Sequence, residues 1–299
     1  MQDFSGKIAV VTGGGSGIGR ALVMQLIAEG CSIAMCDISE EDMAEVAQAA
    51  SAEATQGAKV ISFRADVGSE TDLEAFRDHV LAETGGDHID LLFNNAGVAG
   101  GGSFVAGDRA QWERTFGVCW NGVYYGCRVF MPLLLKATEG HVVNVSSVNG
   151  FWASIGPQTP HTAYCAAKFA VKGFTEALMT DLAINAPHVK ASVVMPGHIG
   201  TKIALNTMRE HGISGLEGGE ESIEEARQRG EFFRDNGLSP DQAAKIILDG
   251  VKADKWRILV GEDAMALDAA VRAQPEGVYT PEFAAAVFPG MVVEGDVPQ

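Results

Sequence analysis

Short runs of apolar, largely β-branched residues alternate with longer segments of helical periodicity as far as about residue 200. The runs predict strands at residues 8–12, 32–36, 60–64, 91–94, 141–146 and 190–195. The segments between them predict helices at 17–29, 40–55, 71–84, 109–135 and 163–185, each long enough for a right-handed crossover between parallel strands. Runs that are apolar at almost every position are typical of strands buried on both faces. The pattern therefore predicts an α/β fold with a doubly wound parallel sheet.

The pattern loosens after Thr201. Residues 202–238 are rich in glycine and charge, and we interpret them as a helical lid rather than a solvated surface excursion, because long irregular insertions in compact domains are usually functional. A helix at 240–253 and a strand at 256–260 then resume the alternation. The stretch 279–299 is apolar for a free tail, so we expect it to pack on a neighbouring subunit.

The amino-acid composition limits the classes of protein to which this chain can belong. The 299 residues are 46% apolar, which excludes disorder, and carry 22 Lys and Arg against 39 Asp and Glu, a formal net charge of −17. Such an acidic balance argues against nucleic-acid binding and against adhesion to anionic membranes. The sequence has no apolar run of about eighteen residues and no secretory signal pattern, so we expect a cytoplasmic protein.

The cysteines and histidines do not form a metal-binding pattern. The seven histidines are scattered without an H-E-x-x-H motif, and the cysteines lack a C-x-x-C pair. We therefore expect reduced, buried thiols, with no disulfide and no metal site. The five cysteines are Cys31, Cys36, Cys119, Cys127 and Cys165.

A glycine-rich turn joins the first predicted strand to the first predicted helix. It reads Thr12-Gly13-Gly14-Gly15-Ser16-Gly17-Ile18-Gly19. Glycines let the backbone turn sharply and approach a pyrophosphate, whose charge the N–H groups and positive end of the following helix receive. The turn does not end in Gly-Lys-Ser/Thr, which excludes a nucleoside triphosphate P-loop. It predicts a dinucleotide site.

Asp37 stands at the end of the second predicted strand, eighteen residues after Gly19. A carboxylate there accepts hydrogen bonds from a ribose 2′-hydroxyl and repels a 2′-phosphate. The residues that follow, Ile38-Ser39-Glu40, offer no cation to a phosphate. The position favours NAD over NADP; the alternative is an aspartate that merely closes a strand-end turn.

Four motifs in this order resemble those of the short-chain dehydrogenase/reductase family, closely over residues 6–201 and loosely over 239–261. They are the T-G-x-x-x-G-x-G turn, Asn94-Asn95-Ala96-Gly97, Tyr164-x-x-x-Lys168 and Pro196-Gly197-His198-Ile199-Gly200-Thr201. The resemblance implies a Rossmann-type fold and a homodimer or homotetramer that pairs through helices 109–135 and 163–185. It places Asp66 and Val67 beside the adenine, Asn95, Ala96 and Gly97 on the ribose side, and Pro196, Gly197, Ile199 and Thr201 at the nicotinamide carboxamide. The remaining NAD-binding residues would be Gly13, Gly15, Ser16, Gly17, Ile18, Gly19, Asp37, Ile38, Tyr164 and Lys168.

Tyr164 and Lys168 lie four residues apart, so they share one face of the predicted helix 163–185. A neighbouring ammonium favours the phenolate, so we expect Lys168 and oxidised nicotinamide to lower the pKa of Tyr164 from about 10 toward neutrality. Tyr164 then serves as general acid/base between a secondary alcohol and a ketone. The family pattern points to Ser147 as the group that holds the substrate oxygen, and Ser154 is the alternative, because the spacing from Ser147 to Tyr164 is about four residues longer than the family's usual gap.

One position departs from the family pattern. The family places a catalytic Asn directly after Val118, where this chain has Cys119. Asn121 lies two residues on, about 200 degrees around a regular helix. A thiol hydrogen-bonds weakly, so either a backbone carbonyl and water replace the amide, or a local helix distortion brings Asn121 round, or catalysis is slow. We take the first as the hypothesis.

Residues near Tyr164 suggest the nature of the substrate. Phe151, Trp152 and Ile155 would form an apolar wall for a mainly apolar substrate, or they pack under the lid. His161 and His198 either contact substrate or, more commonly for loop histidines, make one structural hydrogen bond.

These patterns predict an NAD-dependent oxidoreductase that interconverts a small-molecule secondary alcohol and a ketone. Residues 1–265 would form the NAD-binding catalytic domain, with the lid at about 202–238, and 266–299 a C-terminal extension. The alternative is a dinucleotide-binding sensor or scaffold with weak or no turnover, which only the missing Asn and the acidic lid support. A sugar-nucleotide epimerase or dehydratase is disfavoured by the glycine spacing and by the lack of a larger substrate domain.

Overall fold

The computed structural model describes residues 1–55, 57–155, 159–211 and 223–287. Within them seven parallel strands form one sheet in the order β3-β2-β1-β4-β5-β6-β7. The order reverses between β1 and β4, which is the switch point where open α/β sheets bind ligands. The doubly wound Rossmann-type fold predicted from the sequence is confirmed. The strands are β1 Ile8–Thr12, β2 Ser32–Asp37, β3 Val60–Arg64, β4 Leu91–Asn94, β5 Gly140–Val145, β6 Val189–Pro196 and β7 Arg257–Val260.

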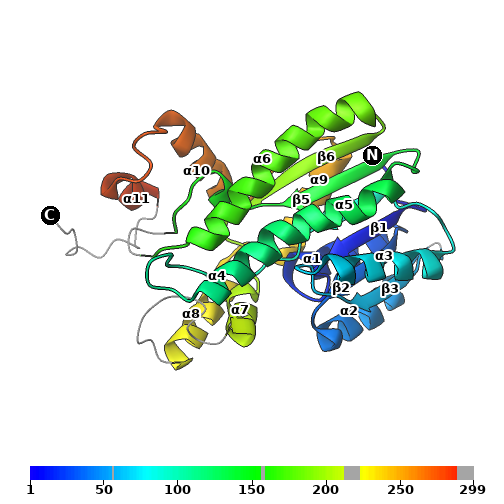
Figure 1. Ribbon diagram of the computed structural model, residues 1–299, viewed down its shortest axis with the longest axis horizontal. Helices are drawn as coiled ribbons and strands as arrows, with labels where there is room; N and C mark the ends of the chain where they lie inside the picture. Colours follow the sequence, from blue (N-terminus) through cyan, green and yellow to red (C-terminus); the bar gives the residue numbers. More distant parts are fainter. Residues whose placement is uncertain (56, 156–158, 212–222, 288–299) are drawn as a thin grey trace.

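Helices cover both faces of this sheet (Figure 1). One apolar cluster joins the strands to α1 Gly17–Ala28, α2 Glu40–Glu53 and α9 Pro240–Lys252. A second cluster joins the opposite face to α3 Glu70–Thr84, α5 Gly122–Leu134 and α6 Thr162–Asn185. Strands covered on both faces explain why their sequences are apolar at nearly every position.

The remaining elements gather at the carboxyl end of the sheet, opposite the chain's N-terminus (Figure 1). The helix α7 Ile203–His211 follows β6, and α8 Ile223–Asn236 packs against α7. These two helices occupy the expected lid at 202–238, of which residues 212–222 lie outside the described part. Beyond β7 come α10 Glu262–Ala273 and α11 Pro281–Val287. The expected end of the main domain at residue 265 thus falls inside α10.

The described part of the C-terminal extension packs on its own chain, and the expected contact of 279–299 with a neighbouring subunit stays a prediction. Trp152 is buried together with Leu267, Val278 and Phe283, in a small cluster separate from the two main ones. The Trp152 and Phe283 rings lie 6.0 Å apart, and Trp152 Nε1 donates a 2.8 Å hydrogen bond to the Val278 carbonyl. Trp152 therefore lines neither a substrate wall nor the underside of the lid. Residues 288–299 of the expected tail lie outside the described part.

Two further observations bear on the protein's class. All five cysteines are buried free thiols, as predicted. Among the described residues, no helix combines the length and the apolar character that crossing a membrane requires.

Candidate active site

The glycine turn after β1 is held tightly against the loop that follows β4. Gly13 has a φ of 67°, and a Cβ there would lie 2.8 Å from Ala96 Cα. Gly17 also has a positive φ, 53°. At Gly19 a Cβ would overlap the Gly13 carbonyl oxygen. Only glycine fits these three positions, because each is either left-handed or crowded by backbone.

The helix that opens from this turn has no side-chain cap. Ser16 is the N-cap residue of α1 and accepts no hydrogen bond from the helix, whereas Ser39, Ser69 and Ser239 each cap their own helices. The first N–H groups of α1 are therefore left for another acceptor, at the positive end of the helix dipole. A dinucleotide pyrophosphate fits this cradle.

Asn95 fixes the turn by its own hydrogen bonds. Its Nδ2 donates to the carbonyl oxygens of Thr12 and Gly13, at 3.0 and 3.3 Å. The backbone N–H groups of Asn95 and Ala96 both donate to Thr12 Oγ1, at 3.0 and 3.1 Å. The Asn95 amide nitrogen therefore holds the turn.

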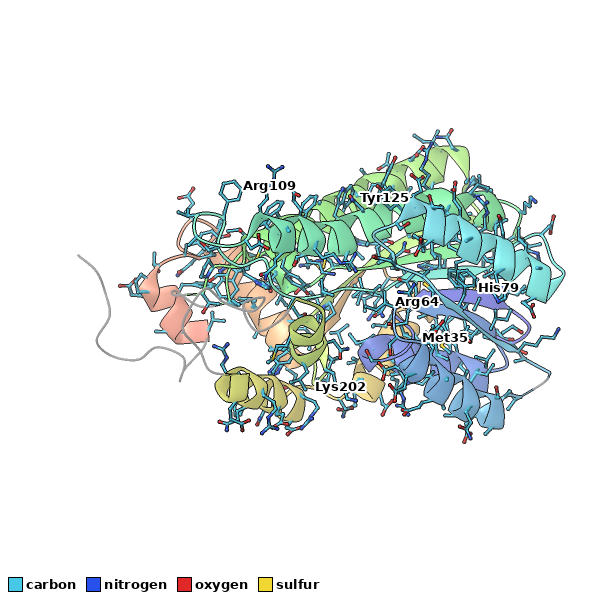
Figure 2. The ribbon with its side chains drawn as sticks, turned by 60° about the horizontal axis from the view of Figure 1, so that its bottom comes forward. Met35, Arg64, His79, Arg109, Tyr125 and Lys202 are labelled. Atoms are coloured by element: carbon cyan, nitrogen blue, oxygen red, sulfur yellow. The ribbon has the colours of Figure 1, made fainter. Side chains whose placement is uncertain are left out.

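Asp37 ends β2 directly beside the turn. Its Oδ2 accepts a 3.0 Å bond from Gly15 N and its Oδ1 a 3.2 Å bond from Ser39 N. Burial raises the pKa of this carboxyl group, and the three backbone N–H groups around it oppose the rise. The neighbouring position on β3 is Arg64, whose exposed side chain lies at this end of the sheet (Figure 2).

Asp66 and Val67 follow β3, as the adenine-side prediction requires. An ion pair of 2.7 Å with Arg114 and a 2.8 Å bond from Gly68 N fix the Asp66 carboxylate. Val67 is buried against Gly122 of α5. Arg114 is a participant that the sequence analysis missed, since a single arginine on an amphipathic helix carries no distinguishing signal.

The structure brings Ser147, Tyr164 and Lys168 together. Ser147 directly follows Ser146 beyond β5, and its side chain lies beside the Tyr164 hydroxyl, whose pKa it acts to lower. The Lys168 ammonium lies 5.3 Å from the centre of the Tyr164 ring and donates a 2.9 Å bond to the Val145 carbonyl. Ser146 instead donates to the Lys168 carbonyl at 2.8 Å, which ties β5 to α6. The contact with Tyr164 favours Ser147 over Ser154 as the group that holds the substrate oxygen.

Burial dominates the ionisation of this group. It raises the pKa of Tyr164, and the side chain of Ser147 only partly opposes the rise. Burial also lowers the pKa of Lys168. Residue spacing predicts that Lys168 is adjacent to Tyr164 but does not report this desolvation. The expectation that Lys168 and oxidised nicotinamide together lower the pKa of Tyr164 concerns the protein with bound cofactor and stays a prediction. A positive charge bound beside Tyr164 would have to lower its pKa before the phenol can act as a base near neutral pH.

The helix predicted at 109–135 is interrupted beside Lys168. It comprises α4 Arg109–Phe116, a π-helical turn η1 Gly117–Asn121, and α5. Cys119 within that turn is fully buried and donates to the Val98 carbonyl at 3.2 Å. A Cβ on Gly97 would lie 3.6 Å from Lys168 Nζ and 3.8 Å from Cys119 Sγ, so the thiol and the ammonium flank the same glycine.

The π-helical turn does not deliver Asn121 to the site. Asn121 Nδ2 would lie 3.8 Å from a Cβ on Gly117, so the amide is turned back along its own helix. The helix distortion that we considered is present, but Cys119 is the residue that faces Lys168. π-bulges often occur at functional sites, which fits this placement.

The helix α7 lies across the dinucleotide cradle. Asn206 Nδ2 donates to Ser16 Oγ at 3.3 Å, and Ala99 N donates to Thr207 Oγ1 at 2.9 Å. The Thr201 methyl group would lie 3.1 Å from a Cβ on Gly17. Lys202, labelled at the lower edge of Figure 2, directly precedes α7. These contacts place α7, the first helix of the expected lid, beside the cradle.

The two histidines near the site differ in their contacts. The His198 ring is tilted against the Phe233 ring at 4.2 Å and is hydrogen-bonded through Nε2 to the Phe233 carbonyl at 2.7 Å, so it has the structural role. The His161 ring lies 4.7 Å from the Tyr164 ring. Burial lowers the pKa of His161 to about 4, which keeps its imidazole neutral at physiological pH.

The turn at 196–201 is held from β7 and α10. Gly197 N donates to the Val260 carbonyl at 2.9 Å, and His198 N donates to Asp263 Oδ2 at 2.6 Å. Sequence reasoning missed Asp263, whose one signal was its place shortly after the predicted strand 256–260. It also missed Asn149, which donates from its backbone to Ser147 Oγ at 3.1 Å.

A dinucleotide cradle at the switch point and a Ser-Tyr-Lys group beside it define a dehydrogenase-type active site. The family model for short chain dehydrogenases matches residues 7–211. The chain belongs to this family and is an oxidoreductase.

Relatives with a similar extent support this membership. The chain is 38% identical to the Mycobacterium tuberculosis oxidoreductase SadH over 275 residues, which cover 91% of this chain and 92% of SadH. It is 32% identical to levodione reductase of Leifsonia aquatica over 211 residues, 69% of this chain and 74% of that enzyme. Among solved structures, a short-chain dehydrogenase/reductase from Burkholderia phymatum in complex with NAD superposes with a TM-score of 0.80 at 30% identity, covering 94% of this chain and 98% of that one.

Proposed function

We propose that this protein is an NAD-dependent dehydrogenase/reductase that interconverts a secondary alcohol and a ketone. The observation that carries the proposal is the Ser147–Tyr164 hydroxyl pair, with the Lys168 ammonium 5.3 Å from the Tyr164 ring. The test is NAD-linked turnover of secondary alcohols by the purified protein, compared with its Tyr164→Phe variant. Tight NADH binding without turnover across a broad panel would favour the dinucleotide-binding sensor instead.

Each side chain has a defined part in the reaction. Ser147 donates to or accepts from the substrate oxygen and so holds it beside the Tyr164 hydroxyl. Tyr164 takes the hydroxyl proton during oxidation and returns it to the carbonyl oxygen during reduction. Lys168 keeps a positive charge near the phenol and has N–H groups for the nicotinamide ribose. When bound, the oxidised nicotinamide would accept the hydride that leaves the substrate carbon bearing the hydroxyl group.

Four features of the cradle support NAD as the cofactor. The glycine turn, the uncapped N-terminus of α1 and the Asp66 carboxylate fit a dinucleotide. Asp37 places a negative group where NADP carries a phosphate. The Burkholderia phymatum neighbour, which shares the fold over nearly the whole chain, was solved with NAD.

The residues that the sequence placed near the substrate differ in their positions. Phe151 is partly buried, with Arg257 5.4 Å from its ring, so it is part of the C-terminal cluster as Trp152 is. The His161 ring is tilted against the Tyr164 ring at 4.7 Å, so His161 is the polar side chain best placed to meet a substrate substituent. We propose a small-molecule secondary alcohol or ketone as substrate.

Substitution of Cys119 tests how protons leave the active site. We propose that a backbone carbonyl and water replace the amide that the family places here, so Cys119→Asn should change kcat by less than about threefold, far below the 10²–10⁴ of general acid–base catalysis. Steady-state turnover of this variant measures the effect, and Cys119→Ser serves as the control of nearly equal size. A tenfold gain in kcat for Cys119→Asn alone would show that the relay is impaired in the native chain.

An aromatic surface on α5 and α6 supports a homodimer or homotetramer. Tyr124, Phe169 and Ile184 are 38%, 42% and 73% exposed. Trp120 joins the two helices, since its ring stacks on Tyr124 of α5 and meets Phe174 of α6 edge-on. We expect Phe169→Glu to shift the sedimentation coefficient toward that of a monomer, because it buries a charge in the interface. The exposed substitution Met265→Glu on α10 is the control; an unshifted Phe169→Glu protein would argue that the subunits pair elsewhere.

A further inference from the structure

The C-terminal helices contact two separate parts of the site that the reaction has to hold at a fixed distance. One part is the turn that carries Ser147, and the other is the turn at 196–201 on the nicotinamide side. We refer to residues 262–287, which comprise α10, α11 and their connection, as the C-terminal brace.

At the serine turn, the contact runs through buried groups. Asn149 donates from its backbone to Ser147 Oγ at 3.1 Å and from its side chain to the carbonyls of Trp152 and Ser154 at 3.0 and 2.8 Å. Trp152 in turn donates from its indole to the Val278 carbonyl of the brace at 2.8 Å. Asn149 and Trp152 are 6% and 2% exposed, so this chain of bonds is shielded from water.

The backbone beside Trp152 adds a second bond to the brace. Ala153 N donates to the Tyr279 hydroxyl at 3.3 Å, and Val148 and Phe151 pack around the cluster of Trp152 and Phe283. The helix α10 also packs against the turn η2 Val148–Gly150 that follows Ser147. The brace therefore fixes the whole segment after Ser147.

At the nicotinamide side, one carboxylate makes the contact. Asp263 Oδ2 accepts a 2.6 Å bond from His198 N. A Cβ on Gly197 or on Gly261 would overlap the Asp263 carboxylate, so this group sits directly against the backbone of both turns. A short bond to an ionised acceptor is stronger than a neutral one.

We propose that the C-terminal brace positions the substrate-oxygen side and the nicotinamide side of the site relative to each other, with Trp152 and Asp263 as the positioning residues. The proposal rests on the proposed function, which assigns the substrate oxygen to Ser147. Neither residue touches reacting atoms. Small displacements of a positioned group cost much rate, because the reacting atoms have to meet within a narrow range of distances.

The serine arm of the test uses Trp152→Phe in the full chain. Phenylalanine keeps the aromatic packing and removes the indole donor to Val278. We expect kcat to fall by about fivefold or more with the Kd for NADH within about twofold, because one neutral hydrogen bond amounts to about a factor of five and displacement of Ser147 acts on chemistry. Phe76→Leu in α3 is the destabilised control, since Phe76 is equally buried and far from the site. A Trp152→Phe variant that loses only thermal stability, as the control does, would overturn the proposal.

The nicotinamide arm uses Asp263→Ala, with Glu262→Ala as the matched control in the same first turn of α10. We expect the Kd for NADH, measured by fluorescence, to rise by about fivefold or more for Asp263→Ala and to stay unchanged for Glu262→Ala. Equal Kd values for the two variants would overturn the proposal. The double variant Trp152→Phe/Asp263→Ala should be non-additive in kcat/KM, because both arms act through one element.

The two arms separate this inference from the proposed function. If the wild-type protein turns over no alcohol or ketone, the proposed function fails, while the NADH-binding arm still decides whether Asp263 positions the cofactor side. If the wild-type protein turns over and both variants match their controls, the proposed function stands and the brace has only a structural role.

Discussion

Tyr164→Phe is expected to lower kcat by about 10²–10⁴-fold, because it removes the one atom that exchanges a proton with the substrate oxygen. The substitution deletes only the hydroxyl, so the ring contacts with His161 and Lys168 remain. NADH affinity should therefore stay within about twofold of the wild type. Steady-state turnover and NADH fluorescence titration measure the two quantities on the same preparation.

The pH dependence adds a second readout for Tyr164. Burial raises the pKa of this phenol in the protein alone, so the neutral acid form prevails at physiological pH. Alcohol oxidation needs the phenolate, and its rate should rise with pH until Tyr164 has ionised, while ketone reduction should fall over the same range. A Tyr164→Phe protein that keeps both its turnover and this pH profile would remove Tyr164 from the mechanism.

Replacement of Asp37 by Ser together with Ile38→Arg is expected to reverse the cofactor preference from NAD to NADP. The change removes a carboxylate that would repel the 2′-phosphate and adds a guanidinium that can bind it. Loss of a hydrogen bond to a charged group costs about 1.5–3 kcal/mol, so NAD should bind about ten- to a hundredfold more weakly.

The ratio of kcat/KM for NAD and NADP measures this switch. Asp37 also accepts bonds from Gly15 N and Ser39 N, so Asp37→Asn is the control that keeps an acceptor for the turn and removes the charge. An unchanged preference for NAD in the double variant would show that Asp37 merely closes the end of β2.

Much of the fold could be predicted because its signals are local. The strands of the sheet are runs of apolar residues, and the first helix begins at Gly17, where the glycine turn ends. The pairing of Tyr164 with Lys168 also followed from spacing alone, because residues four apart share a helix face. These predictions depend only on contacts within one element or one turn.

The features that the sequence did not predict depend on distant contacts. The π-helical turn around Cys119 inserts an extra residue without any change in apolar periodicity. Trp152 meets Val278 from 126 positions away, so its burial against the brace had no local signal, and the sequence offered only a substrate wall or packing under the lid. The raised pKa of Tyr164 likewise comes from burial by surrounding elements, which residue spacing does not report.

Transfer of deuterium tests the central claim most directly. A panel of secondary alcohols that carry deuterium on the carbinol carbon is incubated with the protein and NAD, and the reduced cofactor is analysed by mass spectrometry. The account predicts NADH that contains one deuterium per turnover, and the Tyr164→Phe variant is expected to form this labelled NADH about 10²–10⁴-fold more slowly. NADH without deuterium, or labelling at an equal rate by the variant, would contradict direct hydride transfer governed by Tyr164.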